Sequence, residues 1–180
     1  GGVGSIAVQL AKKIFKFGKV VATAGRADSQ AWTLKQGADV TLDRSRPYEA
    51  QLKDLGISGF DYILSCSSID DILDQLISIS KPFGQICSIV ETHKPLDLSN
   101  MFAKAVGLSF EFMSTRPLFN VDLERQHTIL AQGAALIDNG TLQPWVGITY
   151  DKATLETVRA GHVLQESGTA IGKITFDAKF

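Results

Sequence analysis

The chain is poor in the residues that several classes of protein require. It has only two cysteines, Cys66 and Cys87, and each lies inside an apolar run, so we interpret both as buried small side chains. A structural zinc site normally takes about four suitably spaced ligands. The three histidines share no H-x-x-H or H-E-x-x-H spacing, so the sequence predicts no metal site.

An excess of charge of one sign and long apolar runs are also missing. Lysine plus arginine total 18 against 19 aspartate plus glutamate, a net charge of -1, which provides no broad cationic field for phosphate backbones or anionic lipids. No apolar run approaches the roughly 20 residues that span a bilayer, and no signal-peptide pattern opens the chain. We expect a cytoplasmic protein that binds neither nucleic acid nor membrane.

The chain does have an ordinary globular balance, with 44% apolar and 21% charged residues over 180 positions, about the length of one domain. Strands are predicted at 19–23, 40–42, 60–64 and 85–90, and helices at 5–17, 28–36, 47–55 and 70–80, with Gly84 marking a turn. Helices are also predicted at 98–106, 121–138 and 151–166, an edge strand at 108–114, and extended segments at 142–150 and 171–176. This alternation predicts an α/β fold with a mainly parallel, doubly wound sheet.

A glycine cluster, Gly1-Gly2-Val3-Gly4, leads directly into the helix predicted for 5–17. Glycines have no Cβ, so a ligand can approach the backbone closely. The N–H groups and the dipole at the start of a helix attract negative charge. The cluster therefore indicates a phosphate site.

Six segments of the chain occur in the order and spacing of one enzyme family: GGVGSIAVQLAK, KQGAD, DYILSCSS, KPFGQICSIVE, LSFEFMSTRPLF and ESGTAIGKITF. Together they resemble the medium-chain dehydrogenase/reductases, in the zinc-type alcohol dehydrogenase-like branch related to quinone oxidoreductases. The resemblance covers essentially the whole chain. It implies an NAD(P)-binding Rossmann domain at residues 1–147 and a C-terminal segment, 148–180, that returns toward a catalytic domain.

The chain departs from the family pattern at its start. The family fingerprint G-x-G-x-x-G follows a strand, whereas here only the second and third glycines, Gly1 and Gly4, are present. The first βα strand and the N-terminal catalytic domain, which carries the metal ligands of true zinc enzymes, are missing. We therefore expect a Rossmann-like sheet without its first strand, no zinc site in this chain, and a fragment that is inactive by itself.

The cofactor can be argued from one position. NAD-preferring Rossmann domains place a carboxylate about 20 residues past the glycines to bind the ribose hydroxyls. Ala24 stands where that carboxylate would be, and Arg26, which follows, could pair with a 2′-phosphate. Asp28 complicates this reading because it could neutralise Arg26 instead. NADP(H) is therefore favoured over NAD(H), with a solvated loop arginine as the alternative role of Arg26.

The resemblance implies further cofactor contacts along the chain. The complete predicted cofactor-binding set is Gly1, Gly2, Val3, Gly4, Arg26, Ser65, Cys66, Val90, Phe112, Met113 and Lys173. Three of these have an alternative structural reading: Val90 and Phe112 as core residues, and Lys173 as a surface charge. No catalytic proton donor is predicted.

The resemblance implies an NAD(P)-dependent oxidoreductase that transfers hydride to a carbonyl or an activated double bond of a small-molecule substrate. The alternative is a non-catalytic nucleotide-binding or oligomerisation module. A methyltransferase-like domain is less favoured, because it expects an acidic residue at the position of Ala24. Family members use a run like 108–114 to form homodimers, so we expect a dimer through this edge; an interior strand is the alternative.

Overall fold

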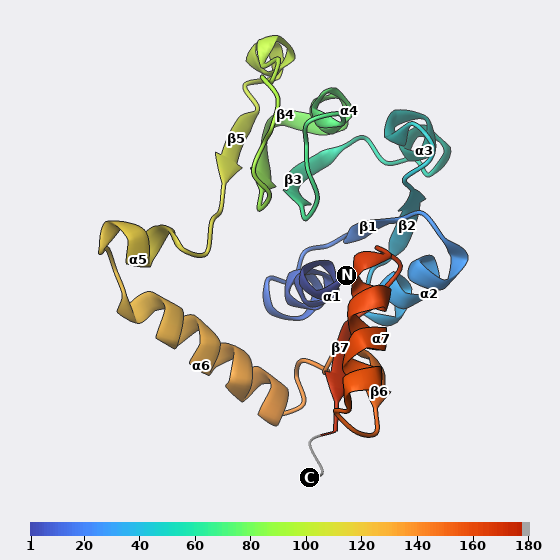
Figure 1. Ribbon diagram of the computed structural model, residues 1–180. Helices are drawn as coiled ribbons and strands as arrows, with labels where there is room; N and C mark the ends of the chain where they lie inside the picture. Colours follow the sequence, from blue (N-terminus) through green and yellow to red (C-terminus); the bar gives the residue numbers. More distant parts are fainter. Residues whose placement is uncertain (178–180) are drawn as a thin grey trace. The chain divides into compact units, whose positions relative to one another are not determined.

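The computed structural model describes residues 1–177, which divide into two compact units (Figure 1). The first unit combines Gly1–Leu42 with the part of the chain that starts at Ile129, and the second is Asp43–Thr128. The α-helices are α1 (Gly2–Gln9), α2 (Ala27–Lys35), α3 (Tyr48–Asp54), α4 (Leu73–Ser78), α5 (Thr115–Phe119), α6 (Glu124–Asp138) and α7 (Leu155–Glu166). The strands are β1 (Val21–Ala24), β2 (Val40–Asp43), β3 (Phe60–Ser65), β4 (Ser80–Ser88), β5 (Gly107–Phe110), β6 (Val146–Tyr150) and β7 (Lys173–Phe176).

The strands pair in three sheets, with orders β1-β2, β3-β4-β5 and β6-β7. The β3-β4, β4-β5 and β6-β7 pairs are parallel, so the predicted α/β class with parallel strands is confirmed. None of the helices within residues 1–177 is long and apolar enough to cross a membrane. The boundary predicted at 147/148 falls inside β6, and the return of 148–180 toward a catalytic domain stays a prediction.

The first helix begins earlier than the sequence pattern predicts. The glycine cluster belongs to it, since α1 starts at Gly2 and continues as a π-helical turn, η1 (Leu10–Ile14). The buried residues of α1 are Ser5, Val8 and Gln9, so two of the three are polar. The predicted end at 17 was too late, because the chain leaves the helix after Ile14 and turns at Lys16, whose φ is 53°.

A small apolar core joins α1 to the first two strands. Val8, Val20 and Ala38 are buried together, and Val20 precedes β1 while Ala38 precedes β2. At the rim, Asp39 accepts hydrogen bonds from the Lys12 ammonium at 2.7 and 2.8 Å and from the Val20 amide at 2.7 Å. These donors hold the pKa of Asp39 below its ordinary value of 3.8, so its carboxylate stays ionised at neutral pH.

The C-terminal part of the first unit is a βαβ unit in which α7 connects β6 to the parallel strand β7 (Figure 1). Thr154 caps the start of α7, because its hydroxyl accepts a hydrogen bond from the Thr157 amide at 3.2 Å. Such a cap satisfies one of the backbone donors that a helix start leaves unpaired. The Tyr150 and Phe176 rings stack with centroids 5.3 Å apart. This contact packs the end of β6 against the end of β7.

The second unit is a three-stranded parallel sheet with helices packed on it. Ile86 of β4 is fully buried, as are Ile69 and the apolar face of α4. The helix predicted at 70–80 is shorter in the structure, where α4 spans only Leu73–Ser78. A 3₁₀ helix, η2 (Ser99–Lys104), takes the place of the helix predicted at 98–106. Lys104 at its end donates to the carbonyls of Ile77, Ser78 and Ser80 at 2.7 to 3.0 Å.

The turn predicted at Gly84 was wrong. Gly84 lies inside β4, where the register with β3 shifts between Phe60 and Tyr62. Phe83 has a φ of 64°, so the strand bulges at this point rather than reversing. A Cβ on Gly84 would come within 2.9 Å of the Lys81 carbonyl oxygen, which explains why glycine stands here.

The edge strand predicted at 108–114 is shorter than its alternating pattern indicates. Strand β5 ends at Phe110, and α5 begins at Thr115. The sequence pattern did not predict α5, because Pro117 in its middle is unfavourable in a helix interior. A five-residue helix accommodates it because Pro117 lies within the first turn, where backbone N–H groups have no helical partner.

Candidate functional site

The start of α1 presents backbone N–H groups on an open side. The first helical hydrogen bond runs from the Ser5 amide to the Gly1 carbonyl at 3.1 Å. The amides of Gly2, Val3 and Gly4 precede that bond, so the helix itself offers them no carbonyl. A Cβ on Gly1 or Gly4 would meet nothing within 4 Å, which leaves room for a ligand beside the helix start.

Lys173 places a positive charge at this helix start. It is the first residue of β7, and its amide donates to the Trp145 carbonyl at 2.8 Å. Its ammonium end lies against Gly2, so closely that a Cβ on Gly2 would collide with it. An ammonium group and helix N–H groups at one place favour an anion, as a phosphate group requires.

A buried hydroxyl braces the same turn of helix, and the sequence analysis did not identify it. Ser5 is buried; its Oγ donates to the Gly1 carbonyl at 2.8 Å and accepts from Trp32 Nε1 at 2.8 Å. Trp32 belongs to α2, so this bond fixes α2 against the glycine cluster. In the sequence, the one sign of this contact was the single tryptophan within the predicted helix 28–36, whose ring N–H needs an acceptor when it is buried.

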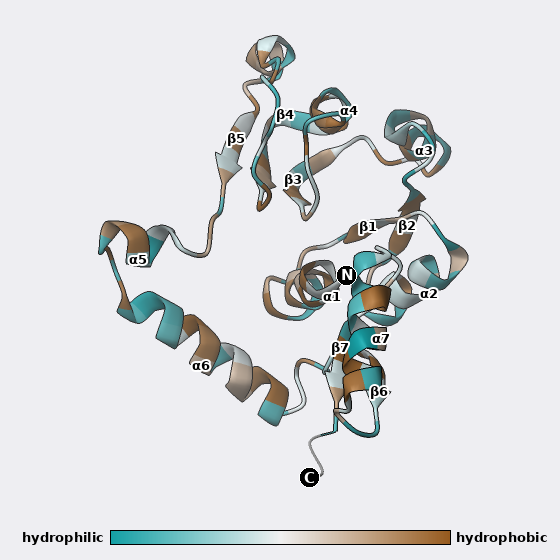
Figure 2. Cartoon of the chain, in the orientation of Figure 1, coloured by the Kyte–Doolittle hydropathy of each residue, from teal (hydrophilic) through white to brown (hydrophobic). Residues whose placement is uncertain are grey.

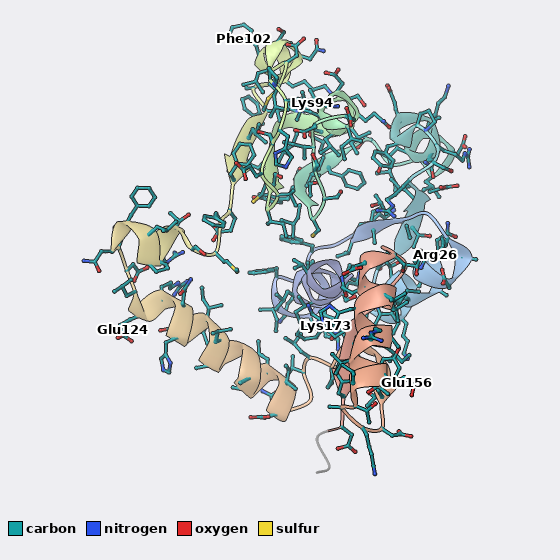
Figure 3. The ribbon with its side chains drawn as sticks, in the orientation of Figure 1. Arg26, Lys94, Phe102, Glu124, Glu156 and Lys173 are labelled. Atoms are coloured by element: carbon teal, nitrogen blue, oxygen red, sulfur yellow. The ribbon has the colours of Figure 1, made fainter. Side chains whose placement is uncertain are left out.

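Arg26 lies between β1 and α2 (Figure 3), in the position predicted to face a 2′-phosphate. Its Nε donates to Asp28 Oδ1 at 3.1 Å, and its Nη2 donates to the Thr169 carbonyl at 2.8 Å. Asp28 therefore pairs with Arg26, which the sequence analysis gave as the alternative to a free arginine. Ala24, which ends β1, is only 3% exposed, so the strand ends on a buried, small apolar side chain; its correspondence to the NAD-binding carboxylate position stays a prediction.

The other predicted contacts belong to the second unit and follow its three neighbouring strands. Ser65 is the last residue of β3, Val90 lies two residues beyond β4, and Phe112 lies two residues beyond β5. The strands are parallel, so these positions share the carboxyl edge of one sheet, where ligands of α/β proteins bind. Their role as cofactor contacts stays a prediction, as does that of Cys66 and Met113.

Some of the sequence interpretations of these residues need correction. Cys66 is exposed and Cys87 half-buried, because Cys66 lies in the bend after Ser65 rather than in the strand. Phe112 is not a core residue, since it is exposed beyond the end of β5. Val90 is half-buried; it does not end β4, which stops at Ser88.

Two acidic residues join the segments that follow β3 and β4, a feature that the sequence analysis missed. Asp70 accepts the His93 amide at 3.1 and 3.2 Å, and Asp71 pairs with the Lys94 ammonium at 2.5 Å. Burial acts to raise the pKa of Asp70, but the His93 amide and Ser68 hold it below 3.8. The Asp71 carboxylate raises the pKa of Lys94 above 10.5.

No group of three or more histidine, cysteine, aspartate or glutamate residues within residues 1–177 could hold a metal ion. A zinc site takes at least three protein ligands. The residues that the structure describes therefore do not fit zinc.

The parallel α/β architecture and the glycine-led helix define a Rossmann-like dinucleotide-fold protein. Residues 2–121 match the family described as zinc-binding dehydrogenase, so the chain belongs to that family, a family of oxidoreductases. The resemblance to zinc-type alcohol dehydrogenase-like proteins is confirmed.

Individual relatives agree with this assignment. A zinc-type alcohol dehydrogenase-like protein of Staphylococcus epidermidis is 34% identical over 180 residues, covering 99% of this chain and 53% of that protein. A Rhizobium etli CFN 42 structure, assigned to the zinc-dependent alcohol dehydrogenases, has a TM-score of 0.89 and 31% identity, covering 100% of this chain and 52% of that one.

A third relative is an alcohol dehydrogenase superfamily protein from Novosphingobium aromaticivorans. Its structure has a TM-score of 0.75 and 26% identity, covering 96% of this chain and 51% of that one. The chain therefore spans about half the length of the relatives it matches.

Proposed function

We propose that this chain is the nicotinamide-dinucleotide-binding part of an oxidoreductase, that it prefers NADP(H) to NAD(H), and that its reaction transfers hydride to a carbonyl or an activated double bond of a small molecule. The observation that carries the proposal is the Lys173 ammonium lying against Gly2 at the start of α1. A pyrophosphate is bound by a cation together with N–H donors that have no helical partner, and this helix start provides both.

The roles of the chain's own residues follow from this arrangement. The amides of Gly2, Val3 and Gly4 bind the pyrophosphate, and Lys173 neutralises part of its charge. Ser5 and Trp32 hold the helix start in place through their 2.8 Å hydrogen bond. The nicotinamide ring, when bound, supplies or accepts the hydride. The protein's contribution at this site is to position the dinucleotide.

The preference for the 2′-phosphorylated cofactor rests on the end of β1. Ala24 has no carboxylate, so it neither binds the ribose hydroxyls nor repels a 2′-phosphate. Arg26 stands two residues further on. Arginine binds phosphate through paired N–H donors, which lysine does not offer. This supports NADP(H) as the better ligand of the two.

Replacing Lys173 with methionine is expected to weaken NADPH binding by about tenfold, the loss of one charge-assisted contact. Nicotinamide fluorescence titration of the purified protein measures the dissociation constant. Lys152→Met is the matched control, because Lys152 is an exposed lysine of the same unit and should leave binding unchanged. A folded protein that binds neither NADPH nor NADH contradicts the proposal and favours the non-catalytic oligomerisation module.

We also propose that two copies of the chain pair through β5. In the described sheet β5 is the outer strand, with β4 on one side only. Exposed apolar side chains lie at its end and beyond it, among them Phe110 at 54% exposure and Phe119 at 73%. Figure 2 shows part of α5 in the apolar colour, beside a hydrophilic stretch. An unpaired strand edge beside exposed aromatic residues favours pairing with another chain. A second copy offers the same edge and the same apolar surface.

Replacing Phe110 with lysine is expected to convert the dimer into a monomer, since a charge at a paired edge prevents edge-to-edge contact. Light scattering on the purified protein reports the mass. Val163→Lys changes an exposed apolar residue of α7 and should leave the dimer intact. A wild-type protein that stays monomeric at the highest concentration light scattering allows would rule out this interface.

A further inference from the structure

We infer that Asp28 is a specificity-determining residue: its carboxylate occupies the edge of the Arg26 guanidinium that would receive a 2′-phosphate, so that NADH also binds and the preference for NADPH is modest. The inference rests on the proposed dinucleotide function and refines it. It concerns only residues of the first unit, and it explains an ion pair in a position where a free arginine is expected.

Three of the five N–H donors of Arg26, those on Nε and Nη2, are already engaged by the protein. A guanidinium binds a carboxylate or phosphate bidentately through two neighbouring N–H groups. Asp28 takes one such edge, with Nε at 3.1 Å from Oδ1 and Nη2 at 3.5 Å from Oδ2. The second hydrogen of Nη2 goes to the Thr169 carbonyl at 2.8 Å. Nη2 belongs to both the Nε–Nη2 edge and the Nη1–Nη2 edge of the guanidinium. A phosphate at the first edge must therefore displace Asp28, and a phosphate that uses Nη2 at the second edge must displace the Thr169 carbonyl.

Both partners of Arg26 are themselves held in place. Asp28 Oδ1 accepts the Ser29 amide at 2.7 Å, in the first turn of α2, where the helix dipole favours a negative charge. The Thr169 amide donates to Ser167 Oγ at 3.2 Å, and Gly168 between them has a φ of 68°. The carboxylate and the carbonyl are thus ordered by contacts that do not involve Arg26.

The consequence differs between the two cofactors. The 2′-phosphate of NADPH carries two negative charges and is repelled by Asp28. The 2′-hydroxyl of NADH is a hydrogen-bond donor, and a carboxylate is the group that accepts it in NAD-preferring domains. Asp28 therefore weakens NADPH binding and assists NADH binding at the same arginine.

The test is the ratio of NADPH to NADH affinity in Asp28→Asn, measured by fluorescence titration of the purified protein. Asparagine keeps the oxygen that accepts the Ser29 amide and removes the charge; its NH2 group replaces the oxygen that faces Arg26 Nη2. We expect the ratio to rise by about tenfold, the size of the repulsion between two charges and a carboxylate about 6 Å away in water. Competition by 2′,5′-ADP and by ADP measures the same ratio without the nicotinamide ring.

Asp151→Asn is the matched control, because Asp151 is an exposed acid of the same unit and should not change the ratio. Arg26→Ala should bring the NADPH affinity below that of NADH, because Asp28 remains without the compensating cation. If Asp28→Asn does not fold, Asp28→Ser retains a capping oxygen and makes the same test. An unchanged ratio with both cofactors bound overturns the role of Asp28 alone, whereas a folded wild-type protein that binds neither cofactor overturns the dinucleotide function itself.

Discussion

Replacing Gly172 with alanine is expected to lower the free energy of unfolding by about 3 to 5 kcal/mol, which is exceptional for the addition of one methyl group. Gly172 has a φ of 69°, in the left-handed region that an alanine side chain disfavours by about 1 kcal/mol. Its Cβ would also stand 2.6 Å from the Trp145 carbonyl oxygen and 2.8 Å from the Gly147 nitrogen. These atoms belong to the backbone, so no side-chain rotation relieves the contact.

The effect is large because two glycines meet at the start of the β6-β7 pair. A Cβ on Gly147 would collide with the Ile171 carbonyl oxygen, and the register of the pair shifts between Val146 and Ile148. The backbones of β6 and of the segment before β7 approach each other more closely here than a side chain on either glycine would permit. Lys173, which reaches the helix start at Gly2, follows directly, so the variant should also weaken dinucleotide binding.

Chemical denaturation followed by circular dichroism measures this loss. Gly133→Ala is the matched control, because Gly133 lies within α6 and its Cβ would meet nothing within 4 Å. That variant should instead be more stable by about 0.5 to 1 kcal/mol, since glycine is unfavourable inside a helix. A Gly172→Ala protein within about 1 kcal/mol of the wild type would show that the two strands can separate without cost.

Local pattern was sufficient for most of the fold. The helix around Gln30 and the strand around Tyr62 were predicted because their apolar spacing and terminal glycines are local signals. The failures arose where pairing between distant segments decides the conformation. Gly84 looks like a turn residue by itself, yet its place in β4 is set by the contact of that strand with Phe60, 24 positions away.

The candidate site divides in the same way. The glycine cluster and the Arg26-Asp28 pair were found from sequence because their members are neighbours in the chain. The Trp32-Ser5 bond joins residues 27 positions apart, and the contact of Asp70 with the His93 amide joins residues 23 positions apart. A single sequence contains no spacing rule for such contacts, since they depend on how helices and strands pack.

Gln9 shows how a polar residue can organise the core of the first unit. Its side chain is 1% exposed, and it makes three hydrogen bonds. Nε2 donates to Gln36 Oε1 at 2.8 Å and to the Gln143 carbonyl at 2.9 Å, while Oε1 accepts the Gln143 amide at 2.8 Å. One amide group thus joins α1, the end of α2 and the segment that follows α6.

Replacing Gln9 with leucine is expected to lower the free energy of unfolding by about 2 to 4 kcal/mol, because each buried polar group left without a partner costs about 1 to 3 kcal/mol. Denaturant unfolding measures the change. The Gln36→Leu variant and the double variant complete a thermodynamic cycle. Once both side-chain amides are leucines, Gln36 Oε1 is no longer an unpaired acceptor, so the double variant should lose less stability than the two single losses combined. Additive losses would mean that the Gln9-Gln36 bond contributes nothing, and that Gln9 acts only through the Gln143 backbone.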